Sequence, residues 1–138
     1  MKALTLTQPW ATLVAIGAKR IETRSWSTAY RGPLAIHAAK GMPREAIGLC
    51  FTPLFTDALL RAGYRFPRRD LPFGAVVAIV RLVGTRRTED VAPQLAGTKE
   101  LTFGDYTPGR YAWFFEYDGP LALPVAATGH LGLWEWTP

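Results

Sequence analysis

The sequence predicts an α+β fold in which a small curled sheet or open barrel is flanked by helices. Short segments with the alternating or β-branched pattern of strands recur along the whole chain, whereas helical patterns gather in its first half. With 138 residues, 49% of them hydrophobic and 20% charged, the chain has the length and composition of a folded protein with one core. We therefore expect a single domain over residues 1–138.

The first third of the chain predicts three strands and one helix. Leucine and threonine alternate near the start, which is the period of a strand, and Pro9 suits the first turn of a helix. In the strand after this helix, Glu22 and Arg24 share one face and Thr23 lies on the opposite face. We expect strands at residues 2–7, 20–26 and 34–38, and a helix over residues 9–16.

The remainder of the chain predicts two more helices and several strands. Pro43 and Pro53 each suit the first turn of a short helix, which indicates a helical insert near residues 43–63. A basic, proline-containing stretch follows and is expected to be an exposed loop, and residues 84–108 are polar and irregular, with a turn of helix near residues 89–95. We expect further strands at residues 75–83, 110–117, 121–126 and 133–136.

Cysteine and histidine usage argues against a disulfide and against a zinc site. Cys50 is the only cysteine, and His37 and His130 do not form a spaced ligand set. Walker-type and dinucleotide-type glycine loops are missing from the sequence, so no cofactor is expected. The longest apolar run is too short to cross a bilayer and the start has no signal-peptide pattern, which leads us to expect a cytoplasmic protein without a membrane partner.

The charge of the chain is positive and unevenly distributed. Sixteen Lys and Arg residues against eleven Asp and Glu give a net charge of +5 and a pI of about 9.7. The first 70 residues hold eleven of the basic and four of the acidic residues. This asymmetry predicts a one-sided basic surface and a polyanionic partner.

The densest group of chemically versatile residues lies between residues 8 and 34. It contains Gln8-Pro9-Trp10, the spacing G-x-K-x-x-E-x-R over residues 17–24, and Tyr30-Arg31-Gly32. Through these motifs the chain resembles the ASCH domains, the activating signal cointegrator homology domains of the PUA-like superfamily. The resemblance is dense over residues 3–39 and resumes at residues 109–113 and 132–134.

This resemblance implies a PUA-like β-barrel with flanking helices and a cleft beside the first helix for RNA or another nucleic acid. Some relatives hydrolyse N4-acylated cytidine, and ribonuclease activity has been attributed to others. In the hydrolase branch, a threonine that resembles a nucleophile occupies the position held here by Glu22. Thr23 does not replace it, because neighbouring strand residues face opposite ways. We therefore expect that the domain binds nucleic acid, and we keep hydrolysis as the alternative function.

The chemistry of Lys19, Glu22 and Arg24 allows three interpretations. Arg24 can fork onto a phosphate while Glu22 accepts a hydrogen bond from a base edge. Alternatively, Lys19 and Glu22 can act as the acid–base pair of a hydrolase for an N4-acylcytidine-like nucleoside, or of a ribonuclease. The third interpretation is an internal ion network that neutralises a partly buried carboxylate.

Aromatic and basic neighbours complete the expected site. Trp26 and Tyr30 lie among polar residues and are expected to stack unpaired bases, whereas Trp10 is expected to be mainly structural. His37 lies close in sequence to Lys40 and is expected to edge the cleft. The expected contacts to RNA, to another single-stranded nucleic acid or to a nucleoside are Gln8, Trp10, Lys19, Glu22, Arg24, Trp26, Tyr30, Arg31, His37 and Lys40.

Overall fold

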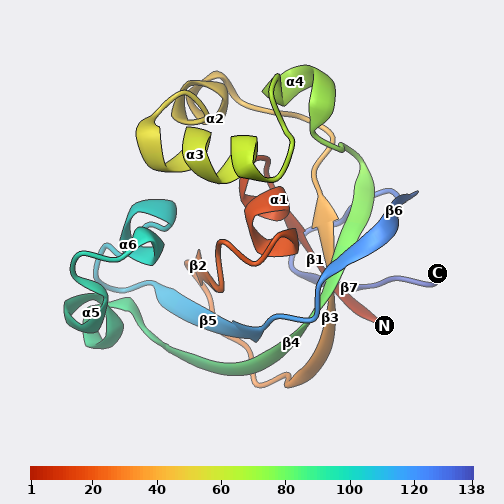
Figure 1. The fold of residues 1–138 in the computed structure, drawn as a ribbon. Helices are drawn as coiled ribbons and strands as arrows, with labels where there is room; N and C mark the ends of the chain where they lie inside the picture. Colours follow the sequence, from red (N-terminus) through yellow and green to blue (C-terminus); the bar gives the residue numbers. More distant parts are fainter.

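The computed structural model describes all residues from 1 to 138 and shows a curled seven-stranded sheet with helices on its open side (Figure 1). The strands are β1 (Lys2–Leu6), β2 (Ile21–Arg24), β3 (Gly32–Ala38), β4 (Ala75–Arg87), β5 (Tyr111–Glu116), β6 (Pro120–Ala126) and β7 (Leu133–Glu135). The helices are α1 (Trp10–Ala15), α2 (Arg44–Leu49), α3 (Pro53–Arg61), α4 (Pro67–Asp70), α5 (Thr88–Val91) and α6 (Lys99–Phe103), with a 3-10 turn, η1, at Ala92–Leu95. The predicted α+β class is confirmed.

The sheet curls along its longest strand, β4, which pairs with β3, β5 and β6. The strand order is β2-β5-β4-β3-β1-β7, and β6 pairs with β4 outside this path. The first part of β4 pairs with β6 and the second part with β5, with register shifts at both junctions. Such irregularities bend a strand and increase its twist. Figure 1 shows the result, a half-barrel that holds α1 in its concave side.

Two neighbouring cores hold the site in place. The concave side of the half-barrel is filled by alternate residues of the strands and by the buried face of α1; its large members are Leu4, Leu6, Val14, Leu34, Ile36, Val80, Leu82, Trp113 and Phe115. A second core joins the other face of α1 to α3 and α6 through Leu13, Phe55, Leu59 and Phe103. Helix α1 is therefore fixed between the sheet and the helical layer.

Two sequence-based expectations about secondary structure were wrong, and a third was incomplete. Strand β4 continues to Arg87 through Gly84, and the expected basic loop contains the short helix α4. The turn of helix expected near residues 89–95 is present as α5 and η1, but the region also contains α6, which was not expected. These helices have only four or five residues, so tertiary contacts rather than periodicity stabilise them. Val91 of α5 packs on Ile21, and Phe103 of α6 packs on Phe55.

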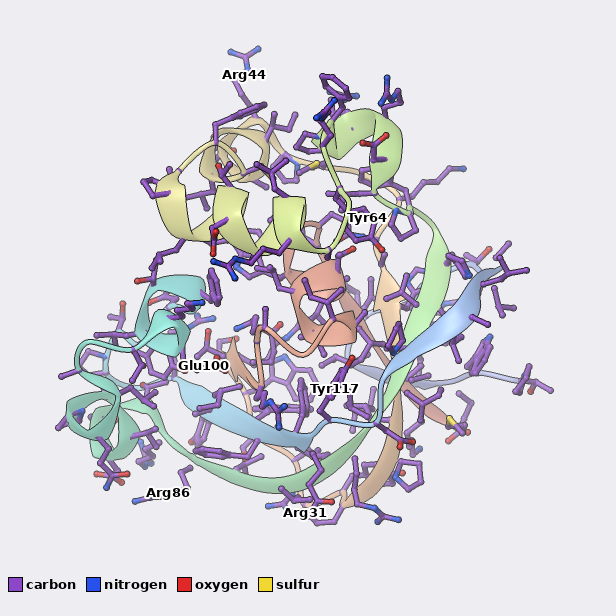
Figure 2. The ribbon with its side chains drawn as sticks, in the orientation of Figure 1. Arg31, Arg44, Tyr64, Arg86, Glu100 and Tyr117 are labelled. Atoms are coloured by element: carbon purple, nitrogen blue, oxygen red, sulfur yellow. The ribbon has the colours of Figure 1, made fainter.

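The basic side chains do not gather on one side of the molecule. Figure 2 shows that Arg44 extends from the end of the molecule at α2, whereas Arg31 and Arg86 lie at the opposite end. Basic residues of the first half of the chain therefore lie at both ends of the molecule, because this half contributes both the helical layer and β3, which reaches the far end of the sheet. No helix of this structure has the length and apolar character required to cross a membrane.

Candidate functional site

The half-barrel is left open between β1 and β2, and the candidate site lies along this seam. Strand β7 pairs with β1 only from Lys2 to Leu4. Beyond Leu4, the carbonyl of Thr5 accepts a hydrogen bond from Nη2 of Arg24, at 2.7 Å. A side chain of β2 therefore reaches β1 at the point where the paired edge ends, and the sheet is not closed by backbone pairing there.

A groove of about 910 Å³ lies at this seam. Its walls are the ends of β1 and β3, residues 73–74 and the loop at residues 126–132. An adjoining hollow of about 230 Å³ is lined by Thr5, Thr7, Trp10, Glu22 and Arg24. Thr5, Thr7 and Arg24 line both spaces, so the two form one continuous site.

The larger groove is lined by cationic groups and by no carboxylate. Arg24 and Lys40 carry positive charge, and the imidazoles of His37 and His130 also line the groove. The only carboxylate of the site is Glu22, which lies in the smaller hollow. The electrostatic character of the groove therefore favours an anionic ligand, with one hydrogen-bond acceptor at its side.

Lys19, Glu22 and Arg24 form an ion network under the seam. Lys19 Nζ lies 3.5 Å from Oε1 of Glu22, and Arg24 Nη2 lies 3.2 Å from the other carboxylate oxygen. The Lys19 side chain is 0% exposed and its ammonium also donates to the carbonyl of Ile21. Glu22 is 11% exposed and Arg24 is 24% exposed. Lys19 thus holds Glu22 from the interior and does not line the groove or the smaller hollow. This arrangement agrees with the interpretation of the three residues as an internal ion network.

The glycine of the G-x-K-x-x-E-x-R motif shapes the turn from α1 to β2. Gly17 has a φ of +79°, which L side chains rarely adopt, and a Cβ there would lie 3.1 Å from the ring of Tyr117. The guanidinium of Arg20 lies 5.3 Å from the centre of the same ring. The turn is therefore packed against Tyr117, at the start of the β5–β6 connection, and Lys19 follows it two residues after Gly17.

His37 holds the loop at residues 126–132 against β1. Its Nε2 lies 2.7 Å from the carbonyl oxygen of Ala127, which only accepts, so we assign the proton to Nε2. Nδ1 then accepts a hydrogen bond from the hydroxyl of Thr5 at 3.1 Å, and the oxygen of that hydroxyl accepts the indole N–H of Trp134 at 3.0 Å. Gly129 fits against this ring, because a Cβ there would lie 2.6 Å from Cε1 of His37. His37 is thus a structural tie at the floor of the groove.

Gln8 and Trp10 flank the start of α1 and have different exposure. Gln8 is fully buried, and its amide bonds to the side chain and backbone of Thr12 and to the carbonyl of Pro72. It therefore does not reach a ligand, contrary to our expectation. Trp10 is half-buried, lines the smaller hollow and packs edge-on against Phe55 with ring centres 6.2 Å apart.

Trp26, Tyr30 and Arg31 lie outside the groove. Trp26 packs edge-on against Trp113 with ring centres 4.8 Å apart, and Arg31 bonds to the hydroxyl of Thr85. Arg31 precedes the first residue of β3, and His37 lies near its last, so about 20 Å of strand separates them. The structure thus brings together five of the ten expected residues, namely Trp10, Glu22, Arg24, His37 and Lys40.

Sequence reasoning missed several groove residues. Thr5 and Thr7 belong to the alternating pattern of the first strand, and their side of that strand could have been recognised as polar. His130 lines the groove and packs on Trp134 with ring centres 5.3 Å apart, although its sequence gives it no evident partner. The loop that carries it comes from the far end of the chain, and only the pairing of β7 with β1 reveals its position.

Two further ionisable groups lie behind the ion network. Burial raises the pKa of Glu100, whose Oε2 accepts the backbone N–H of Arg20 at 2.6 Å. Burial also raises the pKa of Tyr106, and the negative charges of Glu100 and Glu22 raise it further. The positive charge of Lys19 lowers the pKa of Glu100 and so partly offsets the effect of burial.

Comparison with known proteins agrees with this architecture. The ASCH domain model matches residues 4–117. The chain is 41% identical over 83 residues to human activating signal cointegrator 1, covering 58% of this chain and 13% of that protein. It is 40% identical over 106 residues to the mouse protein of the same name, covering 72% of this chain and 17% of that protein. The chain thus spans less than a fifth of the length of these relatives.

A solved structure shows the same fold. It is that of a mutant ASCH protein from Zymomonas mobilis, with a TM-score of 0.52 and 15% identity over 91% of this chain and 72% of that one. The curled half-barrel with helices in and around its concave side is therefore the PUA-like fold that the sequence motifs implied. The family match covers most of the chain and includes every residue of the G-x-K-x-x-E-x-R motif. The chain belongs to the ASCH domain family.

Proposed function

We propose that this ASCH domain binds single-stranded nucleic acid, RNA in particular, in the groove along the β1–β2 seam. The observation that carries the proposal is the groove itself, which combines Arg24, Lys40 and two histidines with no carboxylate, in a chain of net charge +5. Phosphate contacts provide most of the affinity of such complexes, and they require cations that a ligand can reach. Family membership supports the same class of ligand.

Arg24 is arranged to present part of its guanidinium. Its Nη2 is used by the carbonyl of Thr5 and the carboxylate of Glu22, which fixes the plane of the group. No protein hydrogen bond joins Nη1, so this terminal nitrogen remains for a ligand in the groove. A guanidinium held in one orientation loses little entropy when it binds phosphate. We therefore assign the best-defined phosphate contact to Arg24 and a flexible second contact to Lys40.

The smaller hollow suits a base. Trp10 offers an aromatic surface there, and the partly exposed carboxylate of Glu22 can accept a hydrogen bond from an amino group of a base. Recognition of unpaired bases by stacking and by edge hydrogen bonds is typical of proteins that bind single-stranded RNA. In this assignment, Glu22 contributes to base preference, while Arg24 and Lys40 contribute affinity.

Substitution of Lys40 tests the proposal without disturbing the fold. Lys40 is exposed and its side chain forms no ion pair or hydrogen bond within the protein, so Lys40→Gln removes a groove cation without breaking an internal contact. For one phosphate contact, we expect about a fivefold weaker affinity for fluorescein-labelled oligouridylate at 0.1 M salt, and a salt slope smaller by about 0.7. The matched control is Lys99→Gln, an exposed lysine on α6 outside the groove. Anisotropy titrations that show no binding at low salt, or equal losses in both variants, would refute the proposal.

Hydrolysis is the alternative function, and the burial of Lys19 leaves one residue of the expected acid–base pair accessible to a substrate. Lys19 is enclosed, so Glu22 alone would have to exchange protons with an N4-acylcytidine-like nucleoside or an RNA in the hollow. The test is acetate release from N4-acetylcytidine by the unmodified protein. Release that disappears in Glu22→Gln, while binding persists, would show that this domain is an enzyme.

A further inference from the structure

A second basic surface lies next to the groove, on the segment that joins α3 to β4. We call it the α4 surface and define it by Arg65, Phe66, Arg68 and Arg69. The three arginines are exposed, and Phe66 between them is 49% exposed. Only Arg69 forms an ion pair, with Asp70. Arg65 and Arg68 therefore have no acidic partner.

The α4 surface is mounted on an ordered turn. The carboxylate of Asp70 accepts the backbone N–H groups of Arg65 and Phe66, at 3.0 and 2.8 Å. Pro67 and Leu71 are buried, so the turn is fastened to the helical layer. The guanidinium of Arg69 lies 4.2 Å from the centre of the Phe66 ring and forms a stacked pair with it. This pair offers a flat, cationic face to solvent.

The chain leads directly from the α4 surface into the wall of the groove. Phe73 and Gly74 line the groove, and Phe73 follows Arg68 by five residues, a stretch of chain that spans at most about 18 Å. The side chain of Lys40 lies against Gly74 and continues the line of cations from Arg24. Figure 1 shows α4 directly above the end of β4 at which the groove is formed. The two surfaces therefore adjoin.

We propose that the α4 surface binds the part of a nucleic-acid strand that leaves the groove. Arg65 and Arg68 contact phosphates, and the Phe66–Arg69 pair stacks an unpaired base, the combination used by proteins that follow a single strand. This inference rests on the proposed function and predicts a dependence of binding on strand length that a groove without the α4 surface would not produce. Oligonucleotides long enough to pass beyond Lys40 bind more tightly and with a steeper salt dependence than short ones.

A comparison of two ligand lengths tests the inference. Fluorescein-labelled oligouridylates of three and ten nucleotides are titrated into the unmodified protein and into Arg65→Gln/Arg68→Gln. Losing two phosphate contacts should weaken decamer binding by about 10- to 30-fold at 0.1 M salt and lower its salt slope by about 1.4. Trimer binding should stay within about twofold, since a trimer fills only the groove. The matched control is Arg81→Gln/Arg86→Gln, two exposed and unpaired arginines of β4.

The outcomes separate the two proposals. Decamer affinity that falls equally in both double variants would overturn the α4 surface in favour of diffuse charge attraction, even if the trimer still binds. Trimer affinity that falls as much as decamer affinity would also overturn it. Competition by a decaglutamate peptide as strong as that by the decamer would assign the surface to acidic protein segments instead. Failure of both oligonucleotides to bind the unmodified protein would refute the proposed function itself.

Discussion

The burial of Lys19 gives the sharpest stability prediction. Lys19→Met keeps most of the aliphatic stem but removes the ammonium that contacts Glu22 and the carbonyl of Ile21. Because the lysine side chain is 0% exposed, water cannot replace these contacts. Breaking a buried pair by removing one partner costs about 3–5 kcal/mol. Unfolding entropies scale with chain length, so for 138 residues this corresponds to a fall in Tm of about 10–17 °C.

The assay is thermal unfolding followed by circular dichroism, with oligouridylate binding measured well below the transition. The double variant Lys19→Met/Glu22→Gln should recover part of the loss, since it no longer leaves a buried carboxylate with one partner fewer. Binding by the folded single variant should change little, because Lys19 does not line the groove. A Tm within about 2 °C of the unmodified protein together with lost binding would refute this reasoning and return Lys19 to the ligand site.

Three further predictions concern Glu100, Gly129 and Cys50. Burial raises the pKa of Glu100, so its ionisation lowers stability as the pH rises; Glu100→Gln should raise Tm at pH 7, with a gain that shrinks as the pH falls towards 4.5, the ordinary pKa, and is lost below it. Gly129→Ala should lower Tm by several degrees, because its methyl group would lie 2.6 Å from His37, whereas Gly41→Ala, with open space around it, should not. Burial raises the pKa of Cys50 from 9.0 to about 11, so iodoacetamide at pH 8 should alkylate the folded protein at least about 100-fold more slowly than the urea-unfolded chain.

The extent to which the fold could be predicted depended on the size of each element. Period-two alternation identified β1 and β2, and the β-branched run identified the buried half of β4. The outer half of β4 was missed because it is polar and contains Gly84, yet it pairs with β5 up to Arg87. Short helices such as α6 are stabilised by contacts with distant residues, so no local sequence pattern predicts them.

The direction of a site side chain could be predicted where the residue belongs to a strand, and it could not be predicted where the residue belongs to a turn. Glu22 and Arg24 face the seam together because both belong to β2. Lys19 lies in the turn before that strand, where no alternating pattern indicates which way a side chain points, and the structure places its ammonium in the interior against Glu22. The position of Arg31 at the far end of β3 follows from strand length, which only the structure supplies.

The central claim is that the groove along the β1–β2 seam receives a nucleic-acid strand, and one spectrum tests it. The indole N–H of Trp134 donates to Thr5 in the floor of the groove, whereas that of Trp113 donates to the carbonyl of Trp26, away from the groove. In a ¹H–¹⁵N titration with uridine trinucleotide, the Trp134 indole signal should shift with ligand concentration and the Trp113 signal should stay in place. A shift confined to Trp113, or no shift of either signal at saturating trinucleotide, would contradict the account.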